Sequence, residues 1–333
     1  TFPRLFTAPP PPPFARRRPP PSCPKYLPNQ SLIMSANLLL PLPVPSPAAT
    51  HAQLSFPMSI LRRLGPRHLT SSHLLHRRHL SSFAAAAVAR QDTVAWTQAP
   101  LSEIEPVAES LFHVSIDVSD HPDLAASHTL PGQYLQLRIP EVDKPSFLAI
   151  ASPPSFAASR GAFEFLVKSI AGSTAELLCA LKRGNVVELS HVMGKGFGID
   201  QIEPPEKYPT VLIFATGSGI SPIRSLIESG FCAKQRSDVR LYYGARNLKR
   251  MAYQDRFKDW ESSGVTIVPV LSQPDNSWSG EAGYVQAAFA RATQISSPAG
   301  TGAVLCGQKQ MAEEVTSILV AAGVSTDKIL KNF

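Results

Sequence analysis

A glycine-rich turn in the second half of the chain carries the clearest chemical signal. Residues 211–215 are apolar and rich in β-formers, and they run into Thr216, Gly217, Ser218 and Gly219 before a helical pattern begins. A buried strand, a tight turn and a helix start bring backbone N–H groups and the positive end of a helix towards a phosphate. Gly217 and Gly219 permit dihedrals that other residues avoid and let a pyrophosphate approach. The turn predicts dinucleotide binding; an ordinary strand-to-helix turn is the alternative.

This motif departs from its usual form in two places. Pro222 replaces the third glycine of G-x-G-x-x-G, and it suits a first helical turn because its missing N–H would be unpaired there. The second strand of such a fold normally ends in an acid that binds the ribose 2′-hydroxyl. Here the strand at 239–243 is followed by Arg246, with Lys249 and Arg250 close by. We therefore expect NADP(H) to be favoured over NAD(H), unless Arg246 is a solvated loop charge.

The predicted secondary structure around this turn differs between the two halves of the chain. The first half predicts short strands at 112–118, 133–139, 147–151, 163–168 and 186–189, with one helix at 174–182. Such a run of short strands favours a small antiparallel barrel.

The second half alternates strictly between strand and helix. We expect strands at 211–215, 239–243, 265–270 and 302–306, and helices at 220–229, 253–261, 285–292 and 308–322. This alternation predicts an α/β doubly wound parallel sheet. A boundary near Pro204 and Pro205 gives domains at 92–205 and 206–333.

The basic charge of the chain is confined to its beginning. The net charge is +7, yet residues 1–91 contain 11 Lys and Arg and no acid. The remainder has 21 basic and 25 acidic residues, a net charge of −4. The segment is also rich in Pro, Ser, His and Ala, which predicts a disordered leader or transit peptide for a chloroplast, with a mitochondrion as the alternative. We expect its cleavage between about Ser82 and Asp92.

Composition also argues against several classes of function. With the leader removed, the acidic remainder gives no support for nucleic-acid binding. We expect no membrane span, because no apolar run approaches the roughly 18 residues that one needs. The four cysteines lack iron–sulfur spacing, and the histidines show neither metal-ligand nor hydrolase patterns, so we expect no metal site.

The order of a barrel and then a nucleotide-type domain resembles the ferredoxin-NADP reductase superfamily, and within it a reductase-like group from plants. The matching stretches are 131–134, 149–152, 172–174, 194–197, 216–222, 243–246 and 306–307. The resemblance covers about residues 93–333. It implies an FAD-binding β-barrel at 92–205, with FMN as an alternative flavin, and an NAD(P)-binding Rossmann-like domain at 206–333.

The resemblance also assigns site residues. Flavin contacts fall on Phe147, Ala149, Ile150, Ser152, Gly172, Ser173 and Thr174, and a Cys at position 306, followed by Gly307, packs near the hydride-bearing carbon. The turn at 172–174 would offer backbone N–H groups to the flavin phosphate. Alternatively, Ser173 and Glu176 form a capping box that satisfies the helix by itself. Because a buried cysteine is usually a small hydrophobe, we expect Cys306 to act sterically.

The flavin strand departs from the family pattern. Where the family usually has Arg-x-Tyr-Ser, this chain has Ser146, Phe147, Leu148 and Ala149. Loss of a bidentate charged pair forfeits ~1.5–3 kcal/mol, so the flavin should bind more weakly or present its phosphate differently. Lys144 or Lys168 could supply the charge, and Phe147 or Phe333 the aromatic ring, although core packing is the ordinary role of such a Phe.

We therefore expect a flavin-dependent oxidoreductase that takes hydride from NAD(P)H and passes electrons to a separate acceptor, either a small molecule or a redox protein. The competing hypothesis is a non-catalytic NAD(P)-binding or regulatory protein that has lost its flavin, which the missing Arg-x-Tyr-Ser motivates. The net charge of −4 offers no basic docking surface for an acidic ferredoxin. We expect better turnover with a small quinone-like acceptor.

Overall fold

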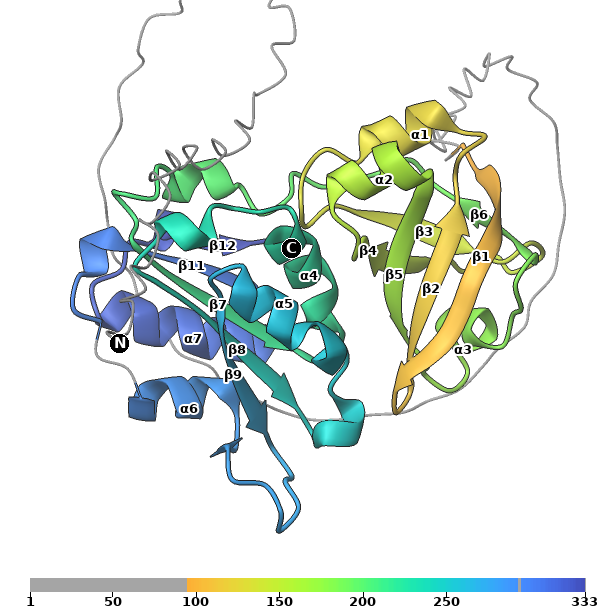
Figure 1. The fold of residues 1–333 in the computed structure, drawn as a ribbon. Coiled ribbons are helices and arrows are strands. Elements are labelled where there is room, and N and C mark those ends of the chain that lie inside the picture. Colours follow the sequence, from red (N-terminus) through yellow and green to blue (C-terminus); the bar gives the residue numbers. More distant parts are fainter. Residues whose placement is uncertain (1–94, 293–294, 333) are drawn as a thin grey trace, which may run out of the picture. The chain divides into compact units, whose positions relative to one another are not determined.

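The computed structural model describes residues 95–292 and 295–332, which belong to one compact unit of the chain (Figure 1). The predicted leader at 1–91 and the last residue, Phe333, lie outside the described residues. The described part contains two six-stranded sheets, one antiparallel and one parallel. The predicted fold class is confirmed, and the domain boundary at 205–206 stays a prediction.

The antiparallel sheet forms a barrel. Its strands are β1 (Thr97–Ala108), β2 (Leu111–Asp117), β3 (Tyr134–Arg138), β4 (Ser146–Ala149), β5 (Ala162–Lys168) and β6 (Val186–Leu189), in the order β4-β3-β6-β1-β2-β5. An antiparallel bridge between Ile150 and Phe165 joins the two outer strands and so closes the sheet. Inward-facing side chains such as Val114 and Ile116 fill the interior.

Three elements of this half were not predicted. β1 contains Pro100 and Pro106, and its pairing with β2 shifts register near both, so it lacks a regular alternating pattern. Two short helices, α1 (Pro122–Ser127) and α2 (Pro154–Arg160), each begin with a proline. Proline fits a first helical turn, but in sequence it also signals a turn, and six or seven residues show too little helical periodicity. The predicted helix is present as α3 (Thr174–Cys179).

The parallel sheet follows the predicted alternation. Its strands are β7 (Thr210–Thr216), β8 (Asp238–Ala245), β9 (Thr266–Leu271), β10 (Glu281–Ala282), β11 (Thr301–Cys306) and β12 (Ile329–Lys331), in the order β10-β9-β8-β7-β11-β12. The helices are α4 (Ile220–Glu228), α5 (Phe257–Ser262), α6 (Val285–Ala292) and α7 (Lys309–Ala321). β10 and β12 have two and three residues and were not predicted, because such short strands show no alternation.

Helices cover both faces of this sheet because β7 is apolar on both of its sides. Val211 and Ile213 pack with α4 and α5, whereas Leu212 and Phe214 pack with α6 and α7. In a doubly wound sheet the crevice at the carboxyl ends of the strands is the usual ligand site.

A buried arginine fixes the segment between the two sheets. Nη1 of Arg236 donates hydrogen bonds to the carbonyls of Ile202, at 3.1 Å, and Tyr208, at 2.6 Å. Its Nη2 pairs with Glu203 at 2.9 Å. Because the arginine side chain is fully buried, these contacts hold residues 202–208 against the start of β8.

Candidate dinucleotide and flavin site

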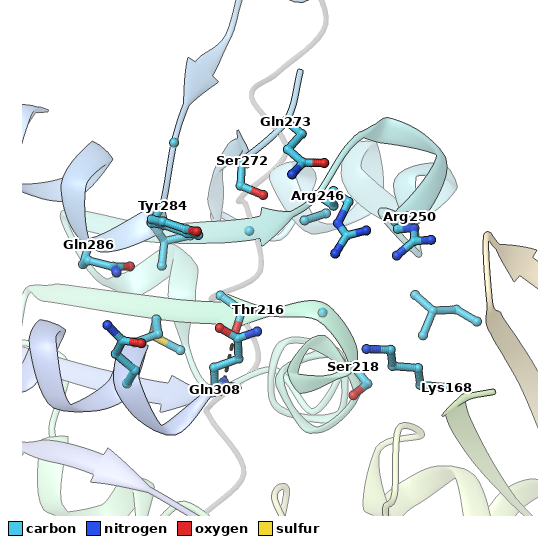
Figure 2. Close-up of a pocket in the computed structure, with 18 of the residues that line it drawn as sticks. Lys168, Thr216, Ser218, Arg246, Arg250, Ser272, Gln273, Tyr284, Gln286 and Gln308 are labelled. Atoms are coloured by element: carbon cyan, nitrogen blue, oxygen red, sulfur yellow. Dashed lines mark hydrogen bonds between the residues drawn. The ribbon is translucent and has the colours of Figure 1, made fainter. Parts of the chain in front are cut away.

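A cavity of about 600 Å³ opens where the strands of the parallel sheet end (Figure 2). Its wall includes residues that follow β7, β8 and β9 and residues at the start of α6 and α7. The barrel contributes Glu109 and Ser110 from the turn between β1 and β2, and Lys168 from the end of β5. Thr216, Gly217, Ser218, Arg246 and Lys168, which we predicted as cofactor-binding residues, therefore line one cavity.

The glycine turn opens to this cavity at Gly217. Its φ of +54° lies in the left-handed region, and a Cβ placed there would meet nothing within 4 Å. An unhindered backbone at the carboxyl end of a strand, just before α4, is the feature that lets a phosphate come close.

Gly219 is needed for a different reason from the one predicted. Its φ is −62°, an ordinary helical value, so it uses no special dihedral. A Cβ at Gly219 would lie 2.5 Å from the carbonyl oxygen of Cys306 and 2.8 Å from Cα of Gly307. The residue is small because the turn packs directly against the end of β11.

Cys306 ends β11 and is followed by Gly307, and neither residue is among those that line the cavity. Gly307 has a φ of +146°, and a Cβ there would lie 2.1 Å from Oγ1 of Thr216. That hydroxyl oxygen accepts a hydrogen bond from the backbone N–H of Gln308 at 3.0 Å. Burial raises the pKa of the Cys306 thiol to about 12, so the sulfur is protonated and unsuited to nucleophilic attack. The steric role of Cys306 stays a prediction.

Three cations reach the cavity and differ in their partners. Arg250 Nη2 pairs with Glu109 Oε1 at 2.5 Å, and that hydrogen bond holds the pKa of the Glu109 carboxyl below its usual range. The exposed Arg246 forms no ion pair with any other described residue, and the exposed Lys168 likewise forms none. Both are available for an anionic ligand.

Several cavity residues were missed in the sequence. Tyr284 is 66% exposed and its ring lies on the wall, near Gln286 (Figure 2). Gln286 Nε2 donates to Glu314 at 2.7 Å. Ser272 and Gln273 follow β9 on the same wall. Their residue types are ordinary for loops; the nearest signal was an aromatic residue directly after a glycine and before a helix.

On the barrel side, β4 presents one aromatic ring. Phe147 is 64% exposed, and its ring centroid lies 6.1 Å from that of Tyr134. Ala149 is partly exposed. Ile150 and Ser152 are fully buried, so their side chains pack and hydrogen-bond within the protein, and the cofactor contacts at these two positions stay a prediction. Ser152 Oγ accepts the backbone N–H of Glu164 at 3.1 Å.

The turn before α3 is closed by a variant of the predicted capping box, in which Glu176 bonds the N–H of Gly172 and the N–H of the N-cap residue Ser173 goes to the carbonyl of Ile170. Ser173 Oγ accepts the N–H of Glu176 at 3.3 Å, and Glu176 Oε2 accepts the N–H of Gly172 at 2.7 Å. Gly172 has a φ of +73° with open space where a Cβ would stand. Thr174 Oγ1 donates to the carbonyl of Lys144 at 2.6 Å. Lys144 is therefore beside this turn, whereas Lys168 lines the dinucleotide cavity.

The exposed ring of Phe147 and the open turn at Gly172 fit a flavin, although Ser146 stands where the family usually has an arginine for the flavin phosphate. Among the described residues no cluster of His, Cys, Asp or Glu could hold a metal ion. The same residues include no helix with the length and apolarity that a membrane crossing requires.

Comparisons with known proteins identify the class. Residues 213–317 match the family described as "Oxidoreductase NAD-binding domain". A ferredoxin NADP+ reductase from Neisseria gonorrhoeae, solved with bound FAD and NADP, shares the fold with a TM-score of 0.59 and 18% identity, over 71% of this chain and 98% of that one. The family model thus marks residues 213–317 as an oxidoreductase NAD-binding domain, and the solved structure shows that the chain has the fold of a ferredoxin-NADP reductase.

Sequence relatives specify the family further. The fruit protein pKIWI502 of Actinidia deliciosa is 52% identical over 273 residues, which are 79% of this chain and 86% of that protein. The xylene/toluene monooxygenase electron transfer component XylA of Pseudomonas putida is 26% identical over 66% of this chain and 61% of its own length. The chain belongs to the ferredoxin-NADP reductase-like family, in the same group as pKIWI502.

Proposed function

We propose that the protein oxidises NADPH, with hydride passing to a bound FAD, and delivers the electrons to a separate acceptor. The observation that carries this proposal is the cavity at the carboxyl ends of the parallel strands, with Gly217 open towards it. FAD, when bound, accepts the hydride and supplies electrons to the acceptor. The protein contributes binding, orientation and electrostatics.

The dinucleotide would lie along the cavity wall. Backbone N–H groups at Gly217 and Ser218 would bind its pyrophosphate, and Lys168 and Arg246 would supply positive charge. The exposed ring of Tyr284 offers a flat surface on which the adenine can stack. Cys306, at the end of β11, would act sterically beside the nicotinamide ring.

NADPH is proposed over NADH because Arg246 has no ion-pair partner among the described residues. Arg246→Ala should raise the Kd for NADPH about tenfold to a hundredfold more than the Kd for NADH, since a charge-assisted contact is worth roughly 1.5–3 kcal/mol. Lys249→Ala, an exposed cation in the same loop that does not line the cavity, is the control and should leave the ratio unchanged. Equal losses for both nucleotides after Arg246→Ala would reject the assignment.

For the flavin, we propose FAD bound against Phe147 with its phosphate at the turn of Gly172, and FMN as the alternative. Lys144 would stand in for the missing arginine, since its backbone is hydrogen-bonded to the same turn. A lysine gives a point charge without the bidentate fork of an arginine, so binding should be weaker than with the family's usual residues.

The electron acceptor is proposed to be a small diffusible molecule such as a quinone, with a separate redox protein as the alternative. The net charge of −4 outside residues 1–91 would slow encounter with an acidic ferredoxin, because like charges suppress it. Cytochrome reduction measured with and without added ferredoxin tests this point. Strong stimulation by ferredoxin that weakens as salt rises would reveal a basic docking patch and contradict the proposal.

A second function remains in competition: a non-catalytic NAD(P)-binding or regulatory protein. It is favoured by the hydrogen bond of 2.7 Å that the N–H of Gly172 donates to Glu176, because this N–H is then not available to a flavin phosphate. A chain that binds NADPH tightly but cannot be loaded with FAD or FMN would establish this second function and exclude the first.

We also propose import into a plastid and cleavage between about Ser82 and Asp92, on the composition of residues 1–91. N-terminal sequencing of the protein purified from tissue tests it. A cytosolic protein that begins at Met58 would contradict it.

A further inference from the structure

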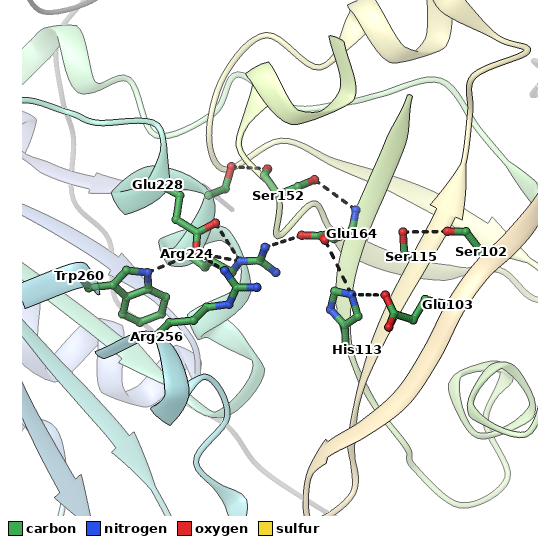
Figure 3. Close-up of polar contacts among 11 residues, drawn as sticks. Ser102, Glu103, His113, Ser115, Ser152, Glu164, Arg224, Glu228, Arg256 and Trp260 are labelled. Atoms are coloured by element: carbon green, nitrogen blue, oxygen red, sulfur yellow. Dashed lines mark hydrogen bonds and ion pairs between the residues drawn. The ribbon is translucent and has the colours of Figure 1, made fainter. Parts of the chain in front are cut away.

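A buried ion-pair cluster connects β5 of the barrel to α4 of the parallel sheet (Figure 3). Its centre is Arg224 of α4, which is 2% exposed. Nη2 of Arg224 donates to Oε2 of Glu164 on β5, and Nε donates at 3.1 Å to both carboxylate oxygens of Glu228, one turn further along α4. One cation thus joins a carboxylate on β5 of the barrel to a carboxylate on α4.

Further side chains contact the cluster on its α4 side and on its barrel side, and they fix the positions of its two carboxylates. Glu228 also accepts hydrogen bonds from Arg256 Nη1 at 3.1 Å and Trp260 Nε1 at 3.2 Å. On the barrel side His113 Nε2 lies 3.8 Å from Glu164. Burial lowers the pKa of His113, which is therefore neutral near pH 7 and leaves Arg224 as the cation that Glu164 pairs with.

Two serines of α4 bind the barrel segment that continues β4. Ser221 Oγ donates to the carbonyl of Ala149 at 3.1 Å, and Ser225 Oγ donates to the carbonyl of Ser152 at 2.8 Å. Ser152 Oγ in turn accepts the N–H of Glu164 at 3.1 Å. The residues of α4 that make these contacts follow helical spacing, so they form one polar face of α4 towards the barrel.

This face links the two cofactor segments directly. α4 begins right after the turn at Gly217–Gly219, which faces the dinucleotide cavity, and residues 149–152 continue the strand that carries Phe147. A short helix is a stiff element, so a displacement of its contacts with the barrel moves the turn relative to β4. Hydride transfer needs reacting atoms about 3–3.5 Å apart, and a misplacement of about 1 Å can cost roughly a hundredfold in rate.

We infer that Arg224 and Glu164 are positioning residues for hydride transfer, fixing the separation between the dinucleotide turn and the flavin strand. The inference rests on the proposed function, because it concerns the reaction between the two cofactors. It differs from a purely structural role in what it predicts: loss of the pair slows the hydride step while nucleotide affinity is kept.

Glu164→Gln in the full chain loaded with FAD is the main test, because it keeps the shape of the side chain and leaves Arg224 paired with Glu228. Under anaerobic single-turnover conditions with saturating NADPH, the first-order rate constant of flavin reduction should fall about tenfold to a hundredfold. The Kd for NADPH, measured by calorimetry, should change less than about twofold. The long-wavelength charge-transfer absorbance of the nicotinamide–flavin complex should weaken as well.

Glu188→Gln is the matched control. Glu188 pairs with Arg138 Nε at 2.5 Å, but both residues belong to the barrel sheet. This variant should lower the melting temperature without slowing flavin reduction. Arg224→Lys keeps the positive charge and should retain more of the rate than Arg224→Met.

The inference is overturned if Glu164→Gln is reduced as fast as the wild type, or no more slowly than Glu188→Gln. It is also overturned if the loss lies wholly in the Kd for NADPH. Should Glu164→Gln not fold, the double variant Ser221→Ala and Ser225→Ala removes two contacts with the barrel without leaving a buried charge unpaired. An unchanged rate of flavin reduction in this double variant overturns the inference. A wild-type chain that NADPH cannot reduce defeats the proposed function itself, and the inference with it.

Discussion

Replacing Gly219 tests how closely the glycine turn packs against β11. The substitution Gly219→Ala adds a single carbon at a position with an ordinary helical φ of −62°. That carbon would stand 2.5 Å from the carbonyl oxygen of Cys306. Since the neighbouring atoms are backbone atoms, they cannot rotate away as a flexible side chain would. Either β11 or the start of α4 has to move.

The loss of stability follows from the overlap between the added Cβ and the backbone of β11. Over-packing of a well-packed site typically costs about 1–3 kcal/mol. For a protein of this size, 1 kcal/mol corresponds to roughly 2–4 °C in melting temperature. Gly219→Ala should therefore lower the melting temperature by about 2–12 °C. It should also weaken NADPH binding, because the displaced turn is the one that faces the pyrophosphate.

Thermal unfolding followed by circular dichroism checks this, with Gly217 as the comparison. At Gly217 the difficulty is the φ of +54° and no atom is near, so Asn, which tolerates the left-handed region, should cost less stability than Ala. At Gly219 the difficulty is space, so Asn should cost at least as much as Ala. A melting temperature of Gly219→Ala within about 1 °C of the wild type would refute the packing argument.

Two further predictions concern single side chains. Burial lowers the pKa of His128 to about 4, against about 6.5 in the unfolded chain, so the unfolded state takes up the proton first and the free energy of unfolding falls by about 3 kcal/mol as pH drops from 6.5 to 4. Urea unfolding of His128→Leu should therefore show a weaker decline over this window than the wild type or His191→Leu, a control at an exposed histidine. An equal decline in all three proteins would contradict this prediction. Glu176→Gln removes a carboxylate beside Gly172. If a flavin phosphate binds at this turn, the Kd for FAD should fall about fivefold, since the repulsion from one like charge at an exposed site is worth roughly 1 kcal/mol. An unchanged Kd would mean that the turn is only a helix cap.

The parts of the fold with strong periodicity could be predicted from sequence. The alternation at 112–118 and the buried run at 211–215 gave β2 and β7 because the hydrophobic pattern of a strand is local. β1 was missed because Pro100 and Pro106 interrupt its pattern, and its pairing with β2 and β6 depends on residues far along the chain. Short helices and two-residue strands give no periodic signal.

The site was predictable where backbone chemistry dictates residue type. Thr216, Gly217 and Ser218 of the glycine turn line the cavity, as does Arg246, whereas Gly219 does not. Tyr284 was not predicted, because a loop aromatic becomes a candidate only once folding places it on a wall. Burial of Ile150 and Ser152 likewise depends on which side of the closed barrel they face. Arg224 gave no signal, since its partner Glu164 lies 60 residues away.

The ultraviolet–visible spectrum of the purified full chain, recorded during an anaerobic titration with NADPH, tests the central claim most directly. The account predicts a yellow protein whose flavin absorbance bleaches as NADPH is added. A colourless protein that neither FAD nor FMN can reconstitute would contradict it.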